Sequence, residues 1–272
     1  MNVKKNNVNL YGMRPTWAEI NLEALRFNLN SITSHLPDEV KMMAVVKADA
    51  YGHGVKQIAR CLQSEGVEDF GVAIAEEGQT LREIGVEGSI LVFGGCYPGQ
   101  EDLFLSNSLV PTVYDLQTLK NLSTLAQLKD TQFPYHLKVD TGMGRLGIGP
   151  DDIGVFLEKA RSYKGMKLRG VFSHLSSADE ADLTYTRKQV SRFEKVLDEI
   201  ELLNNDQIIR HVANSAGTLL HKGHWFDMVR AGLSLYGINP GNAKTPVDLQ
   251  PVMSFKTRIA FIKNVSANTA LG

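Results

Sequence analysis

One lysine stands where an apolar segment meets a glycine-rich one, and it is the strongest candidate for chemistry in the chain. Lys47 follows Val45 and Val46, and residues 48–54 after it include Gly52 and Gly54. A lysine at the end of an apolar strand loses solvation, which lowers its pKa and frees the neutral amine as a nucleophile. The glycines let backbone approach a ligand closely. A strand-end lysine taken alone more often just reaches water, so its neighbours decide the interpretation.

A second pattern suggests a nucleotide site and is rejected. Residues 142–147 fit Gly-x-Gly-x-x-Gly after an expected strand. A dinucleotide site would also need a helix starting at the third glycine and an acidic residue ending the next strand. Here the helix is expected to begin later, at Pro150, and the next strand ends at His174.

Metal and thiol chemistry are not indicated either. His211, His221 and His224 cluster near Asp227 without regular metal-ligand spacing, so we interpret them as surface or packing residues and expect no metal. Cys96 follows two glycines at a strand end, where a small apolar filler is the simpler interpretation.

Short apolar or β-branched segments recur along the chain and are interpreted as strands. They rarely alternate cleanly between apolar and polar residues, which is typical of strands covered on both faces. The predicted strands are 42–47, 70–74, 90–93, 110–114, 135–140, 168–174, 208–214 and 227–231.

Amphipathic segments separate these strands. Residues 115–128 place leucines on one helical stripe behind Asp115 as N-cap, another helix starts at Pro150, and 185–203 is the longest. Alternating strands and helices imply a parallel sheet, and eight such units favour an α/β fold closed as a (β/α)8 TIM-type barrel. A doubly wound open sheet remains the alternative. In such a barrel, functional groups gather at the carboxyl ends of the strands.

Composition bounds the partners. The chain has 272 residues, 43% apolar and 22% charged, with 29 Lys plus Arg against 30 Asp plus Glu. This balance excludes a large basic field, so nucleic acid is not expected as a partner. No apolar segment approaches the ~20 residues of a membrane span, and the polar N-terminus does not resemble a secretory signal. Cys61 and Cys96 are far apart in sequence, so no disulfide framework is expected. We predict a cytoplasmic protein without membrane contact.

The pattern changes after Pro240, where residues 252–265 read as one or two strands with no helix following. We therefore divide the chain into a flexible N-terminus (1–13), the barrel (14–240) and the start of a truncated C-terminal β domain (241–272). The barrel count does not need a further strand at 16–22.

Five segments, in order, closely resemble the alanine racemases, enzymes that use pyridoxal 5′-phosphate (PLP). They are 45–54, 137–147, 172–180, 213–216 and 229–237, and the resemblance runs from Arg14 to about Val265. It implies a barrel of fold type III PLP enzymes, with Lys47 as catalytic residue and covalent PLP attachment point through an internal Schiff base.

The resemblance also implies how the cofactor is bound. Tyr51, Ser215 and the amides of Gly232 and Leu233 would bind the phosphate. A charged guanidinium facing the ring nitrogen disfavours its protonation, which weakens the ring as an electron sink and favours simple removal and return of the α-proton. The implied cofactor-binding residues are Lys47, Tyr51, His174 against the ring, Asn214, Ser215, Arg230 facing the ring nitrogen, Gly232 and Leu233.

Two further residues belong to the implied substrate side. Arg145 would reach the phenolic oxygen of PLP and the substrate carboxylate. Lys138 matches a lysine that many members carry as a carbamate, an anion that holds the arginine. Without that modification, Lys138 would be a barrel lysine paired with Asp140 or another carboxylate.

The function implied is interconversion of L-alanine and D-alanine by a homodimer, supplying D-alanine for bacterial peptidoglycan. In the family, a tyrosine from the C-terminal β domain serves as second catalytic base across the dimer, and we find no match for it. Loss of a positioned acid–base group costs about 10²–10⁴-fold, so we expect weak or no racemisation from these 272 residues.

Three alternatives stay open. The first is a non-catalytic single-barrel protein of PLP binding and homeostasis, which the segment around Lys47 argues against. The second is a fold type III decarboxylase, which should place an acidic residue where Arg230 stands. The third is a racemase for another amino acid, such as serine.

Overall fold

The structure is a computed structural model that describes residues 14–203, 208–241 and 245–272. The predicted flexible N-terminus, 1–13, lies outside the described residues.

Eight parallel strands in the described part of the chain form a barrel, in the order β8-β7-β6-β5-β4-β3-β2-β9. Backbone hydrogen bonds from Asp227 N to Arg210 O and from Arg230 N to Ala213 O, both 3.0 Å, join β9 to β8 and close it. The predicted (β/α)8 barrel is confirmed, and closure excludes the open sheet. The strands are β2 (Lys41–Val45), β3 (Asp69–Val72), β4 (Ser89–Val92), β5 (Val110–Val113), β6 (Phe133–Lys138), β7 (Met166–Phe172), β8 (Ile209–His211) and β9 (Met228–Ala231).

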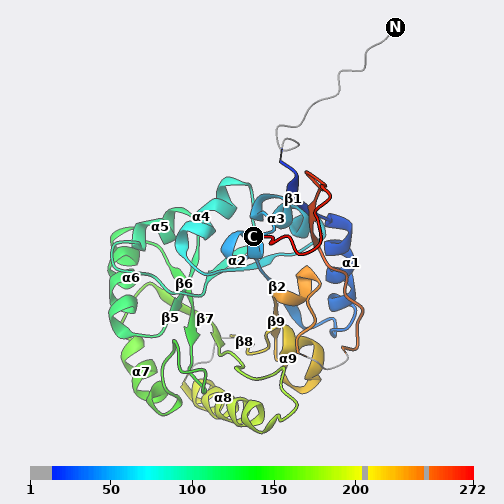
Figure 1. Ribbon diagram of the computed structural model, residues 1–272. Helices are drawn as coiled ribbons and strands as arrows, with labels where there is room; N and C mark the ends of the chain where they lie inside the picture. The colour runs from blue at the N-terminus through cyan, green and yellow to red at the C-terminus, as the bar shows by residue number, and fades with distance from the viewer. Residues whose placement is uncertain (1–13, 204–207, 242–244) are drawn as a thin grey trace.

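Helices surround the strands, as Figure 1 shows in a view along the barrel. They follow the amphipathic pattern of the sequence: in α6, Leu119 and Leu122 are buried, and Asp115 caps the helix by accepting a hydrogen bond from Thr118 N at 2.7 Å. The helices are α1 (Leu22–Thr33), α3 (Val55–Ser64), α4 (Ala75–Glu83), α5 (Glu101–Ser106), α6 (Leu116–Leu128), α7 (Ile153–Ala160), α8 (Thr184–Leu203) and α9 (Ser215–Leu220), with 3-10 turns η2 (Pro150–Asp152), η3 (Lys222–His224) and η4 (Leu233–Tyr236).

The barrel interior holds apolar side chains and buried polar groups in contact with each other. Met43, Leu91, Phe172 and Met228 form one buried apolar cluster. On β6, β8 and β9, buried polar groups lie against Phe172 or next to it: His136, Lys138, His211 and Arg230. Buried basic groups need hydrogen-bond partners, so these strands are where a polar function is expected.

A small second sheet lies outside the barrel. β1 (Thr16–Ile20) pairs antiparallel with β10 (Met253–Thr257), and a 2.8 Å ion pair joins Glu19 to Lys256. One strand therefore forms within the predicted 252–265 segment. The division into domains at 240 stays a prediction. In the described residues, no helix has the length and apolarity to cross a membrane.

Candidate active site at the carboxyl end of the barrel

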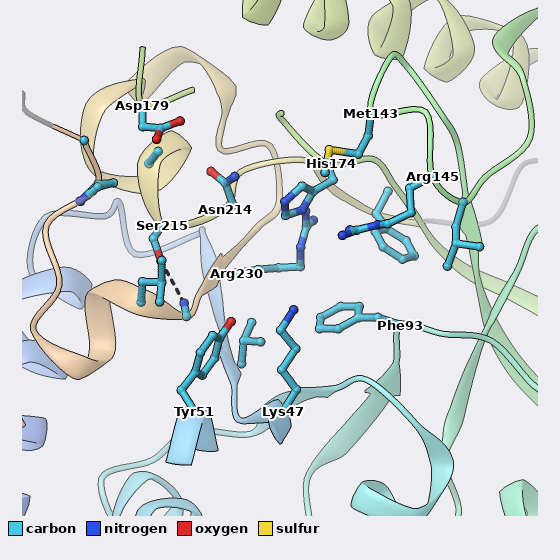
Figure 2. A pocket seen from close by; sticks show the side chains of 18 of the residues that line it. Lys47, Tyr51, Phe93, Met143, Arg145, His174, Asp179, Asn214, Ser215 and Arg230 are labelled. Atoms are coloured by element: carbon cyan, nitrogen blue, oxygen red, sulfur yellow. Dashed lines mark hydrogen bonds between the residues drawn. The ribbon is translucent and has the colours of Figure 1, made fainter. Parts of the chain in front are cut away.

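A cavity of about 450 Å³ opens beside the carboxyl ends of the barrel strands, a size typical of small-molecule sites. Figure 2 shows Lys47 and Tyr51 on one side of it and Arg145 and His174 on the other. Every site residue predicted from the sequence lines this cavity: Lys47, Tyr51, Lys138, Arg145, His174, Asn214, Ser215, Arg230, Gly232 and Leu233.

The backbone after Lys47 forms a left-handed turn, labelled α2 (Lys47–Gly52). Ala48, Asp49, Ala50 and Tyr51 have φ between 51° and 54°. This conformation costs roughly 1–2 kcal/mol per residue for L-amino acids, so other contacts must hold it. Strand β2 ends at Val45, two residues before the predicted end, because the backbone leaves the extended conformation for the left-handed turn here.

Contacts from both sides hold the left-handed turn. Glu77 of α4 accepts a 2.6 Å hydrogen bond from Ala48 N, while its other oxygen accepts one from Ala73 N at 2.7 Å. Asp49 accepts from Val55 N at 2.7 Å and so joins the turn to α3. The turn directs both Lys47 and Tyr51 into the cavity.

Lys47 is more easily deprotonated than an exposed lysine. Its pKa is lowered by burial and by the nearby charge of Arg145, against a smaller opposing effect of Glu77. The unprotonated form is the one that attacks a carbonyl carbon or removes a proton.

Ser215 and Gly232 form a polar cradle beside Tyr51. The Ser215 Oγ accepts hydrogen bonds from Gly232 N (3.0 Å, dashed in Figure 2) and Ser234 N (3.2 Å). A Cβ on residue 232 would lie 2.9 Å from the Tyr51 hydroxyl oxygen, so glycine is needed for this close approach. Asn214 is the N-cap of α9: its side chain accepts from Gly217 N and donates to Leu175 O, and this fixes the position of Ser215, the first residue of the helix.

Arg145 reaches the cavity on a loop that α8 clamps. Asp140 accepts hydrogen bonds from Gly142 N (2.9 Å) and Gly144 N (3.0 Å), which fold the loop back on itself. The Tyr185 hydroxyl of α8 donates to Gly142 O at 2.7 Å. Sequence reasoning did not find Tyr185.

Arg230 is buried and is hydrogen-bonded without a carboxylate. It donates to the backbone oxygens of Ser173 (2.7 Å) and Val212 (3.0 Å) and to His211 Nδ1 (2.9 Å), while His174 Nδ1 lies 3.4 Å away. Burial lowers its pKa to about 9, and the guanidinium therefore remains a cation at neutral pH. It lowers the pKa of His174, which burial and this charge bring to about 2.

Lys138 is buried at the inner end of the cavity. Its Nζ lies 4.4 Å from the centre of the Phe172 ring. Burial, followed by the charges of Arg230 and Arg145, holds its pKa well below the usual value, while Asp140 acts in the opposite direction. A lysine whose pKa is lowered in this way loses its proton more readily, and the unprotonated amine is a nucleophile.

Three other predictions concern residues near this site. Burial raises the pKa of the Cys96 thiol to about 12, as fits an inert filler. His221 bonds Ala178 O at 2.7 Å, and His224 is partly buried. His211, interpreted as a surface or packing residue, is not at the surface: it packs on Phe172 in the barrel interior and also contacts Arg230. The signal in the sequence for this position was the place of His211 in the predicted strand 208–214, where alternate side chains point into the barrel.

Comparison with known proteins identifies the family. The family model described as "Alanine racemase, N-terminal domain" matches residues 20–240. The alanine racemase of Halothermothrix orenii is 43% identical over 259 residues, covering 95% of this chain and 68% of that protein. The alanine racemase of Symbiobacterium thermophilum is 38% identical over 265 residues, covering 97% of this chain and 70% of that protein.

The chain belongs to the alanine racemase family. The solved alanine racemase of Clostridium difficile 630 has a TM-score of 0.88 and 35% identity, covering 95% of this chain and 68% of that one. The alanine racemase of Bartonella henselae, solved with covalently bound pyridoxal phosphate, has a TM-score of 0.81 and 29% identity, covering 89% of this chain and 69% of that one. The family resemblance expected from the five segments is thereby confirmed.

Proposed function

We propose that the chain interconverts L-alanine and D-alanine with PLP as cofactor. The observation that carries this proposal is the position of Lys47, a lysine of lowered pKa facing a cavity with Arg145 and Arg230 on its walls. When bound, PLP supplies an electron-withdrawing ring that acidifies the α-hydrogen of the attached amino acid.

The cavity suits PLP chemically. Cationic side chains line it, and Asp179, an acid among the described lining residues, is exposed. An anionic ligand is therefore favoured over a cationic one. Tyr51 and the Ser215 cradle would hold the phosphate together with the Leu233 amide, and the Lys47 amine would hold the carbonyl carbon.

Each basic residue has a distinct task in this proposal. Lys47 Nζ removes the α-proton on its own face and can return it there. Arg145 binds the substrate carboxylate through charge-assisted hydrogen bonds. Arg230 would face the ring nitrogen as a fixed cation and disfavour a proton on it. His174, whose pKa is lowered by burial and by Arg230, would lie beside the ring as a neutral imidazole.

Lys138 takes up carbon dioxide in this proposal. Its unprotonated amine attacks the carbon of CO₂: a nitrogen–carbon bond forms as one C=O π bond opens, one proton leaves to solvent, and the neutral amine becomes an anionic carbamate. The carbamate then pairs with Arg145, whose charge already acts on Lys138.

Inversion of alanine also needs an acid on the face opposite Lys47, because the proton must return on the side from which it was not removed. A positioned acid–base group contributes about 10²–10⁴-fold.

Location and assembly are further parts of the proposal. Cys61 and Cys96 are free and buried, a usage typical of reducing compartments such as the cytoplasm, where D-alanine for bacterial peptidoglycan would be made. A homodimer would bury apolar side chains that are exposed here, among them Phe255 (78%), Phe261 (78%) and Ile262 (78%).

The deciding experiment is α-proton exchange of L-alanine in heavy water by the PLP-loaded chain, with the enantiomers measured together. Exchange that is abolished in Lys47→Arg supports the proposal, and the amount of D-alanine formed shows how far the second face is served. A chain that holds PLP on Lys47 and exchanges nothing would instead be a PLP-binding protein.

A further inference from the structure

Arg230 is the first member of a buried hydrogen-bonded chain that runs down the barrel interior. Its Nη1 lies 2.9 Å from His211 Nδ1, and His211 Nε2 lies 2.9 Å from His136 Nδ1. His211 is fully buried and His136 is 5% exposed. The mechanism above uses Arg230 but neither imidazole.

Donor and acceptor roles along this chain follow from counting protons. A guanidinium can only donate, so His211 Nδ1 must accept. A neutral His211 then carries its proton on Nε2 and donates to His136 Nδ1, which leaves the proton of His136 on Nε2. Every hydrogen bond therefore points away from Arg230.

Both imidazoles are held neutral, which this assignment requires. Burial, followed by the charge of Arg230, lowers the pKa of His136 to about 3 and that of His211 well below its usual value. The other basic groups acting on them are Arg169 near His136 and Lys138 near His211, and a positive charge on either lowers these pKa values in the same direction as Arg230.

The barrel is built to admit the His136 ring. The register between β6 and β7 shifts at Tyr135/His136, which sets His136 opposite Gly170. A Cβ on Gly170 would lie 2.6 Å from His136 Nδ1. The His211 ring is fixed as well, because it stacks on Phe172 at 4.8 Å with an angle of 5°.

We propose that His136 is a positioning residue that sets the tautomer of His211 and thereby keeps Arg230 directed at the cavity. Without an acceptor at His136 Nδ1, His211 can carry its proton on Nδ1, where it opposes the Arg230 N–H. The guanidinium then loses a hydrogen-bond partner and is no longer held in its direction toward the cavity. The effect on catalysis rests on the proposed function, whereas the tautomer does not.

The matched variants are His136→Asn, which keeps an acceptor at the δ position, and His136→Leu, which fills similar space without one. Nitrogen NMR of the PLP-free chain should show His211 protonated on Nε2 in the parent and in His136→Asn, but at least partly on Nδ1 in His136→Leu. If His136→Leu does not fold, Gly170→Ala displaces the same ring and should cause the same change. A parent His211 protonated on Nδ1, or one tautomer throughout the series, would overturn the proposal.

Activity of the PLP-loaded chain gives a second readout. A misdirected buried hydrogen bond corresponds to about a tenfold loss in kcat/KM for α-proton exchange in His136→Leu, with His136→Asn within about twofold of the parent. If His136 only fills space, the order reverses and the leucine variant is the more active. If the parent exchanges no α-proton, the proposed function fails while the tautomer result still stands.

Discussion

The cations of the cavity are held by neutral partners. Burying a charge is costly unless hydrogen bonds replace water, and Arg230 obtains them from backbone oxygens and an imidazole. Lys138 lies against the Phe172 ring, and burial lowers its pKa, so that it gives up its proton more readily than an exposed lysine. The site is therefore electropositive and ready for an anion, which a carboxylate-paired arginine would not achieve.

Lys138 gives a prediction at this scale. Labelled bicarbonate should produce a carbamate carbon signal that is absent in Lys138→Gln. Because the carbamate would fix Arg145 by charge-assisted hydrogen bonds worth about 1.5–3 kcal/mol, KM for alanine should rise about tenfold or more when bicarbonate is removed. The glutamine variant should not respond to bicarbonate, and a labelled signal that survives in it would contradict the assignment.

Helices and turns could be predicted from the sequence where neighbouring residues determine them, and could not be predicted where distant residues do. Asp115 and its leucine stripe predicted α6 to within a residue. The left-handed turn at 48–51 was missed, because positive φ falls on two alanines, an aspartate and a tyrosine rather than on glycines. Glu77, which stabilises that turn, is 29 residues away in sequence. No local signal reports such a contact.

Glu77→Gln should loosen the turn. The carboxylate accepts from Ala48 N with one oxygen and from Ala73 N with the other, and an amide can accept on one side only. One backbone donor is left unpaired, so we expect a loss of about 1–3 kcal/mol in the free energy of unfolding and weaker PLP binding.

The matched control is Glu76→Gln, on the exposed neighbouring position, where the carboxylate contacts Gln100. Denaturant melts and PLP titrations of both variants measure the difference. Equal behaviour of Glu76→Gln and Glu77→Gln would show that the turn does not depend on the carboxylate.

At the scale of the whole molecule, alternation of strands and helices sufficed to predict the barrel, and the family segments placed ten residues on one cavity. The polar interior was not foreseen, because His136 and His211 are 75 residues apart and meet only when β6, β7 and β8 lie side by side. The roles of the ten residues remain predictions until the variants are measured.

That interior makes stability depend on pH. The folded chain keeps His136 and His211 neutral, with the pKa of His136 lowered to about 3 mainly by burial, whereas an unfolded histidine titrates near about 6.5. The stability that depends on keeping these imidazoles neutral is therefore fully present above about pH 6.5. It is lost as the pH falls from there towards the pKa values of the histidines in the folded chain. In that window, each of the two imidazoles lowers the free energy of unfolding by about 1.4 kcal/mol per pH unit as the pH falls.

His136→Asn removes one of these two titrations. Between pH 7 and pH 5, the free energy of unfolding of the parent should therefore fall by about 2 kcal/mol more than that of the variant. Urea melts of the PLP-free chains at both pH values measure this difference. The contributions of the other histidines to the pH dependence cancel, because parent and variant share them. Equal losses in parent and variant would mean that His136 has the same pKa in the folded and the unfolded chain, so that it gains a proton in the fold by pH 5. Burial would then not hold His136 neutral, and the proton order proposed for the Arg230 chain would lose this support.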